Sequence, residues 1–137
     1  MTELIPNLFI GNWHEARDSQ GFYVITVAHD SGFVGHQHFR LVDGPGNEAS
    51  VFKEAVEAVC CAYRENKKVL VHCVGGRSRS AAVIVAAATK LTGRPFCEVY
   101  DDLLRKHDGT GKGARIHPYL SLLLLECLDG LEVACMS

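Results

Sequence analysis

The stretch Lys68-Val-Leu-Val-His-Cys-Val-Gly-Gly-Arg-Ser-Arg-Ser80 decides the fold of this 137-residue chain. Its first half is a short apolar run rich in β-branched residues, which predicts a buried strand over Lys68–His72. Gly75 and Gly76 then predict a turn, and an apolar segment from Ser80 to Leu91 follows. Because this segment is apolar on every side, we expect a helix in the middle of the domain.

The rest of the chain alternates between strand and helix patterns in the same way. Short β-rich runs predict strands at Leu8–Ile10, Tyr23–Ala28 and His38–Val42. Apolar periodicity and helix-start residues predict helices at Trp13–Ser19, at 51–63 with Asn47 as its cap, at Pro95–Lys106 and at 118–128. This alternation predicts an α/β fold with a central, mainly parallel twisted sheet of four or five strands, flanked by helices on both faces.

No repeat, low-complexity tract or linker interrupts the sequence, so a single domain over residues 1–137 is expected. With 47% hydrophobic and 22% charged residues, the chain can bury a core. A formal net charge of −2 argues against a protein whose main role is nucleic-acid binding. No apolar run approaches the ~20 residues of a membrane span, and the first residues show no signal-peptide pattern, so a cytoplasmic protein is expected.

Six cysteines raise the question of disulfides or a metal site. In a reducing compartment structural disulfides are rare, so five of the six are interpreted as buried apolar residues. Cys73 is the exception. His29, His36 and His38 could ligate zinc, but no cysteine lies near them in the sequence, and three polar residues in one loop is the favoured interpretation. Neither a metal nor a cofactor is expected.

Cys73 opens the turn of the deciding stretch, and Arg79 follows it at the spacing Cys-x5-Arg. A turn of successive backbone N–H groups that leads into a helix N-terminus forms a nest for an oxyanion. Gly75 and Gly76 allow the backbone angles that such a turn needs. Arg79 can hold two oxygens of a phosphate at once. The same positive field favours the thiolate of Cys73, which makes its sulfur a nucleophile toward whatever the nest binds.

The segment His72–Ser80 resembles the H-C-x-x-G-x-x-R-[S/T] signature of the cysteine-dependent phosphatases, and its Ser78-Arg79-Ser80 ending resembles the dual-specificity branch. Ile5–Gly11 with Ala16, Asp43-Gly-Pro and Lys68–Leu91 resemble further parts of that family. The resemblance implies the cysteine-phosphatase fold and a phosphoryl group that passes through Cys73. It implies that the backbone of the loop and the Arg79 side chain bind the phosphate, which involves Val74, Gly75, Gly76, Arg77, Ser78 and Arg79.

The same resemblance suggests the other catalytic residues. Asp43 would donate a proton to the leaving oxygen and later accept one from water. Asp30 is the competing acid, but it lies after an earlier strand, so Asp43 is favoured. Ser80 could donate a hydrogen bond to the sulfur of Cys73. His72 is expected to orient the loop through hydrogen bonds to nearby backbone.

The implied substrate is a protein carrying phosphotyrosine or phosphoserine and phosphothreonine, and several alternatives stay open. Arg77 either adds a cation for a polyanionic substrate, such as a phosphoinositide or an RNA 5′-triphosphate, or points outward toward a surface acid. A sugar phosphate could also be the substrate. Two other hypotheses stay open. The protein could be a binding module that holds phosphate without cleaving it, or an oxyanion reductase or sulfur transferase built on the same nest. The intact set of Cys73, Arg79 and Asp43 favours the hydrolase.

Overall fold

The computed structural model describes residues 1–75, 78–107, 116 and 118–128. The elements follow one another as β1 (Thr2–Ile5), β2 (Leu8–Gly11), α1 (Trp13–Asp18), β3 (Tyr23–Thr26), β4 (Gln37–His38), α2 (Ala49–Arg64), β5 (Val69–His72), α3 (Arg79–Thr92), α4 (Phe96–Lys106) and α5 (Pro118–Cys127). The five strands lie in the order β1-β2-β5-β3-β4. β5 is parallel to both of its neighbours, β4 is parallel to β3, and β1 is antiparallel to β2. The predicted mainly parallel α/β sheet is confirmed.

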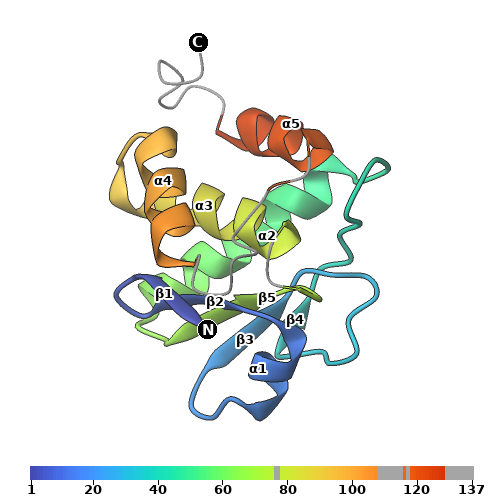
Figure 1. Cartoon of the computed structure of the whole chain (residues 1–137), viewed down its shortest axis with the longest axis vertical. Coiled ribbons are helices and arrows are strands. Elements are labelled where there is room, and N and C mark those ends of the chain that lie inside the picture. Colours follow the sequence, from blue (N-terminus) through green and yellow to red (C-terminus); the bar gives the residue numbers. More distant parts are fainter. Residues whose placement is uncertain (76–77, 108–115, 117, 129–137) are drawn as a thin grey trace.

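The two faces of the sheet are covered unequally. Helices α2, α3, α4 and α5 pack together on one face, whereas α1 lies on the other (Figure 1). The larger core includes Ile25 and Val71 from the sheet and Phe52 from α2. On the α1 face, Ala16 packs with Val24 and Leu70, and three partly buried phenylalanines surround this small cluster. The edge formed by the C-terminal ends of the parallel strands lies between these two layers, where a ligand site is expected.

Helix α3 is the central helix of the larger layer. Every residue from Arg79 to Thr89 is buried, and the helix contacts α2, α4 and α5. Many of its side chains are alanines, so three helices can pack closely around it. The helix ends at Gly93, which has a φ of 71° and donates its N–H to the carbonyl of Thr89 at 3.0 Å. The left-handed conformation explains why glycine stops the helix.

Two predicted elements differ from the structure. β4 covers Gln37–His38, so it shares only His38 with the predicted strand His38–Val42. Beyond β4 the carbonyl of Leu41 accepts the His29 N–H at 3.0 Å, a contact outside the strand pairing of β3 and β4. β1 has no counterpart among the predicted strands. Its four residues pair with β2 across an irregular register, and such a short edge strand carries little pattern of its own.

The cysteines of the described residues are free thiols. Cys60 and Cys127 are buried, as expected, and burial raises the pKa of Cys60 to about 11. Cys61 is exposed on α2, so the expectation of burial was wrong there, whereas Cys97 is half-buried and packs against the larger core. Cys135 lies outside the described residues. Among the helices that the structure describes, none is long and apolar enough to cross a membrane.

Candidate active site

Cys73 directly follows β5 at the C-terminal edge of the sheet, and its side chain is buried. Its sulfur lies 3.2 Å from the hydroxyl oxygen of Ser80, which stands in the first turn of α3. A hydroxyl at this distance can donate to a thiolate. The start of a 14-residue helix adds the partial positive charge of its free N–H groups. The structure therefore brings together the predicted nucleophile, the predicted hydrogen-bond donor and a helix N-terminus.

Arg79 is the first residue of α3, and its side chain is only 7% exposed. One nitrogen, Nη1, donates to the carboxylate of Asp30 at 2.6 Å and to the carbonyl of Leu41 at 3.2 Å. Nε is buried and has no hydrogen-bond partner among the described residues. A buried N–H of a charged group without a partner is costly, and an oxyanion bound at the site would supply one.

Asp30 pairs with Arg79 even though 49 residues separate them. The hydrogen bond from Arg79 is the main reason why the pKa of Asp30 lies below its ordinary value of 3.8. A carboxyl group that stays ionised near neutral pH has no proton to donate, so this contact argues against Asp30 as the general acid. It makes Asp30 the residue that holds Arg79 in place. Sequence reasoning missed this role, since nothing in the local pattern links the two positions.

Asp43 lies in the exposed loop before α2, two residues after the Leu41 carbonyl that accepts from Arg79. The side chain of Asn47 braces this loop: it accepts the Val42 N–H at 2.7 Å and donates to the carbonyls of Val42 and Gly44 at 2.7 and 3.0 Å. The prediction that Asn47 caps α2 was wrong. Glu48 occupies the cap without a side-chain hydrogen bond, because the Asn47 amide is committed to the loop.

His72 is the last residue of β5 and is fully buried. Its Nδ1 lies 3.0 Å from the carbonyl oxygen of Cys73, and its Nε2 lies 2.6 Å from the hydroxyl of Thr26. Burial lowers the pKa of His72 below 6.5, so the ring is neutral at neutral pH. The contact with the Cys73 backbone is of the kind expected for a loop-orienting residue. Thr26 was not singled out in the sequence, although a polar residue inside the apolar run Tyr23–Ala28 was a signal.

The loop itself is described only in part. Val74 is half-buried, and its carbonyl accepts the N–H of Trp13 from α1 at 3.3 Å. Ser78 caps α3 through its backbone, whose carbonyl accepts the Ala82 N–H at 2.9 Å. Gly75 is exposed. Gly76 and Arg77 lie outside the described residues, so the proposed contribution of Arg77 to charge recognition stays a prediction.

Each of the three histidines considered as zinc ligands has a ring nitrogen within hydrogen-bond distance of a backbone group in residues 24–41. His36 Nδ1 accepts the Val24 N–H at 2.9 Å. His38 Nε2 lies 2.7 Å from the carbonyl of Ala28, and His29 Nδ1 lies 3.2 Å from that of Leu41. No group of three metal-ligating side chains occurs within the described part of the chain. These contacts agree with the interpretation of the histidines as polar loop residues.

A cysteine directly after a central parallel strand, with Arg79 at the start of a buried helix, is the arrangement that the sequence predicts for an α/β domain that binds an oxyanion beside a thiol nucleophile. Residues 27–100, more than half of the chain, match the family model described as dual specificity phosphatase, catalytic domain. The chain belongs to this family.

Individual proteins with similar sequences are members of the same family. Human dual specificity protein phosphatase 22 is 29% identical over 104 residues, and this match covers 67% of the chain and 56% of the relative. Dual specificity protein phosphatase OPG106 of monkeypox virus is 33% identical over 98 residues, covering 63% and 57%. The matches thus span little more than half of these curated relatives.

Solved structures share the fold. The crystal structure of human DUSP28 superposes with a TM-score of 0.75 at 20% identity and covers 100% of both chains. The human tyrosine phosphatase-like serine/threonine/tyrosine-interacting protein reaches a TM-score of 0.72 at 21% identity, covering 92% and 93%. Since the second is named as phosphatase-like, the fold alone does not separate an enzyme from a binding protein. This distinction depends on the residues of the site.

Proposed function

We propose that the chain hydrolyses phosphomonoesters through a cysteinyl-phosphate intermediate on the Cys73 sulfur, and that its substrates are proteins carrying phosphotyrosine or phosphoserine and phosphothreonine. The observation that carries the proposal is the 3.2 Å contact between the Cys73 sulfur and the Ser80 hydroxyl at the N-terminus of α3. This contact supports the proposal, because a hydroxyl donor beside the Cys73 sulfur, at a helix N-terminus that favours negative charge, would stabilise the thiolate of the proposed nucleophile. Family membership and the names of the relatives support the class of reaction.

In the first step the Cys73 thiolate attacks phosphorus, and the bond to the leaving oxygen breaks as Asp43 gives that oxygen a proton. Arg79 and the loop amides stabilise the charge on the transferred group. In the second step Asp43 takes a proton from water, the water oxygen attacks phosphorus, and Cys73 leaves as a thiolate. The Ser80 hydroxyl stabilises this leaving thiolate, so its contribution belongs mainly to the second step.

Replacement of the nucleophile tests the proposal directly. We expect Cys73→Ser to lower the turnover of p-nitrophenyl phosphate by about 10³-fold or more, because a serine hydroxyl is a far weaker nucleophile at neutral pH. Cys61→Ser is the matched control, since Cys61 is exposed on α2, and it should keep the activity of the unmodified protein. A Cys73→Ser protein that retains more than a few per cent of activity would refute the covalent route. An inactive unmodified protein that still binds vanadate would indicate a phosphate-binding module instead.

A panel of substrates tests the choice of protein substrates. Peptides with phosphotyrosine and phosphothreonine are compared with inositol phosphates and an RNA 5′-triphosphate at equal concentration. We expect the peptides to have the larger kcat/KM. A preference for the polyanions would transfer the same chemistry to a non-protein substrate and would point to Arg77.

A further inference from the structure

Thr26 and His72 occupy paired positions on the neighbouring parallel strands β3 and β5, at the edge of the sheet where the Cys73 loop begins. Both side chains are fully buried, and the Thr26 hydroxyl lies 2.6 Å from His72 Nε2. Buried polar groups are costly unless they are paired. Each of these two buried groups supplies a hydrogen-bond partner to the other.

The contacts of the two side chains allow one arrangement of protons for the neutral ring. His72 Nδ1 faces the carbonyl of Cys73 at 3.0 Å, and a carbonyl can only accept, so Nδ1 carries the proton. Nε2 is then an acceptor, and the Thr26 hydroxyl donates to it. The oxygen of Thr26 in turn accepts the N–H of Gly35 at 2.9 Å. A chain of hydrogen bonds thus runs from Gly35 through Thr26 and His72 to the Cys73 carbonyl.

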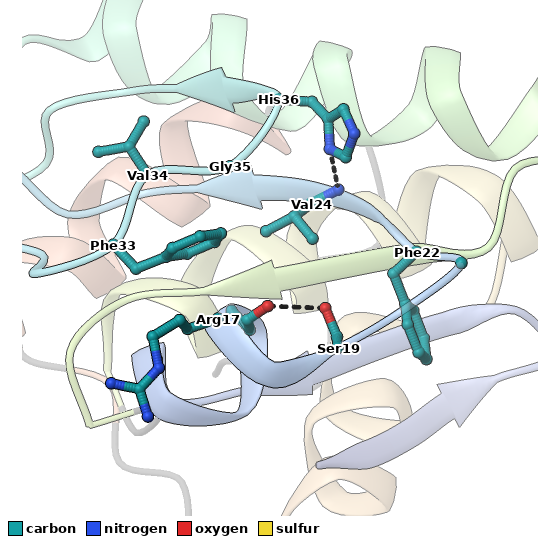
Figure 2. A pocket seen from close by; sticks show the side chains of 10 residues that line it. Arg17, Ser19, Phe22, Val24, Phe33, Val34, Gly35 and His36 are labelled. Carbon is teal, nitrogen blue, oxygen red and sulfur yellow. Dashed lines mark hydrogen bonds between the residues drawn. The ribbon is translucent and has the colours of Figure 1, made fainter.

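Gly35 can reach Thr26 because it has no side chain. A Cβ at this position would lie 2.4 Å from Val24 Cγ1 and 2.7 Å from the Val24 carbonyl oxygen, closer than real contacts allow. The next residue fixes the segment on β3, since the His36 N–H donates to the Val24 carbonyl at 2.8 Å. Figure 2 shows Gly35 and His36 beside Val24, where they form one wall of a surface pocket of about 420 Å³.

The far end of the chain of hydrogen bonds is the peptide unit between Cys73 and Val74. Because this unit is planar, the direction of the Cys73 carbonyl also sets the direction of the Val74 N–H. That N–H is the first amide of the phosphate-binding loop that the proposed function requires. We propose that Thr26 is a positioning residue, which holds His72 with its proton on Nδ1 and thereby aims the Val74 N–H at the phosphate. The catalytic consequence rests on the proposed function, whereas the protonation of His72 does not.

Thr26→Val tests the proposal, because it keeps the shape of the side chain and removes the hydroxyl. We expect the imidazole ¹⁵N spectrum of the unmodified protein to show a protonated Nδ1 and a hydrogen-bonded, unprotonated Nε2. In Thr26→Val the Nε2 signal should lose its hydrogen-bond shift, and kcat/KM for p-nitrophenyl phosphate should fall about tenfold. Thr26→Ser restores the hydroxyl and should return both readouts to near their original values.

Thr89 provides the matched control. Its side chain is buried in α3, and its hydroxyl has no hydrogen-bond partner among the described residues. Thr89→Val should therefore change neither the His72 spectrum nor kcat/KM.

Three results would overturn the proposal: a His72 protonated on Nε2 in the unmodified protein, a Thr26→Val variant with an unchanged Nε2 signal, or one with unchanged kcat/KM. If Thr26→Val does not fold, the spectrum of the unmodified protein decides by itself which nitrogen carries the proton. If the unmodified protein has no phosphatase activity, the proposed function fails, while the imidazole spectra still support or overturn the role of Thr26 in holding His72.

Discussion

In the sequence, Asp30 precedes Leu41 and Asp43 follows it, and the Leu41 carbonyl accepts a hydrogen bond from Arg79. The two carboxyl groups nevertheless differ in their hydrogen-bond partners and exposure. Asp30 is held by Arg79 at 2.6 Å, whereas Asp43 is exposed in a loop that Asn47 braces. Asp30 is bonded to Arg79, the proposed phosphate-binding residue, whereas Asp43, the proposed general acid, is exposed. The proposed mechanism therefore gives the two carboxyl groups different roles, and these lead to different kinetic signatures.

We expect Asp43→Asn to act most strongly on substrates with poor leaving groups. Loss of general-acid catalysis should slow phenyl phosphate by about 10²-fold and p-nitrophenyl phosphate much less, because p-nitrophenolate needs no proton to depart. A series of aryl phosphates, plotted as log kcat/KM against the pKa of the leaving phenol, measures this. The slope should become steeper than in the unmodified protein.

Asp30→Asn serves as the contrast in the same series. It weakens the hold on Arg79, so it should lower kcat/KM by a similar factor for every leaving group and leave the slope unchanged. A steeper slope for Asp30→Asn, with an unchanged one for Asp43→Asn, would exchange the two roles.

At the scale of single elements, the structure shows which sequence patterns were sufficient to predict a strand or a helix. The strand at Lys68–His72 and the helix that Gly93 stops were predictable, because their apolar patterns and terminating residues are local. The predicted strand at His38–Val42 was mostly wrong, because the Leu41 carbonyl is taken by His29 and Arg79. Such competition comes from residues far away in the sequence and leaves no local trace.

The residues of the candidate site also fall into a predictable group and an unpredictable group. Cys73, Ser80 and Arg79 could be proposed together because one short loop carries them. The pairs Arg79–Asp30 and His72–Thr26 join positions 49 and 46 residues apart. They depend on strand order and register, and a single sequence does not contain this information. The role of Asn47 was missed for a related reason, since its side chain could either cap the helix or brace the loop, and both choices are local.

Gly93 gives a test of element-scale stability. Its φ of 71° is unfavourable for any residue with a Cβ, although the space around it is open. Gly93→Ala should therefore lower the free energy of unfolding by about 1 kcal/mol through backbone strain alone. Gly44→Ala is the control, because a Cβ at Gly44 would also meet nothing within 4 Å and this residue has no left-handed φ. Urea denaturation of both variants checks the difference, and an equal effect of the two would contradict the strain argument.

At the scale of the whole molecule, the buried His72 makes stability depend on pH. Its pKa is lowered in the folded state, mainly by burial, while the unfolded chain keeps a value near 6.5. Below this value the unfolded state binds a proton that the folded state does not take up. The free energy of unfolding should therefore decrease as the pH falls from about 7 to 5, and it should change little above that range.

One substitution distinguishes the contribution of His72 to this pH dependence from that of the other six histidines. In His72→Asn the side-chain amide can still donate toward the Cys73 carbonyl, but it does not titrate. The pH dependence of unfolding between 5 and 7 should be shallower in this variant. An unchanged slope would assign the dependence to other groups.

The unequal covering of the sheet has a consequence for local motion. Helix α1 has only six residues, and its first N–H, at Trp13, donates to the carbonyl of Val74 in the loop that follows Cys73. Short surface helices open more often than core elements, and amide hydrogen exchange records these openings. Exchange at α1 should therefore be faster than at α3, and each opening releases Val74 from one side. The lifetime of the hydrogen bond between Trp13 and Val74 should therefore follow the opening rate of α1.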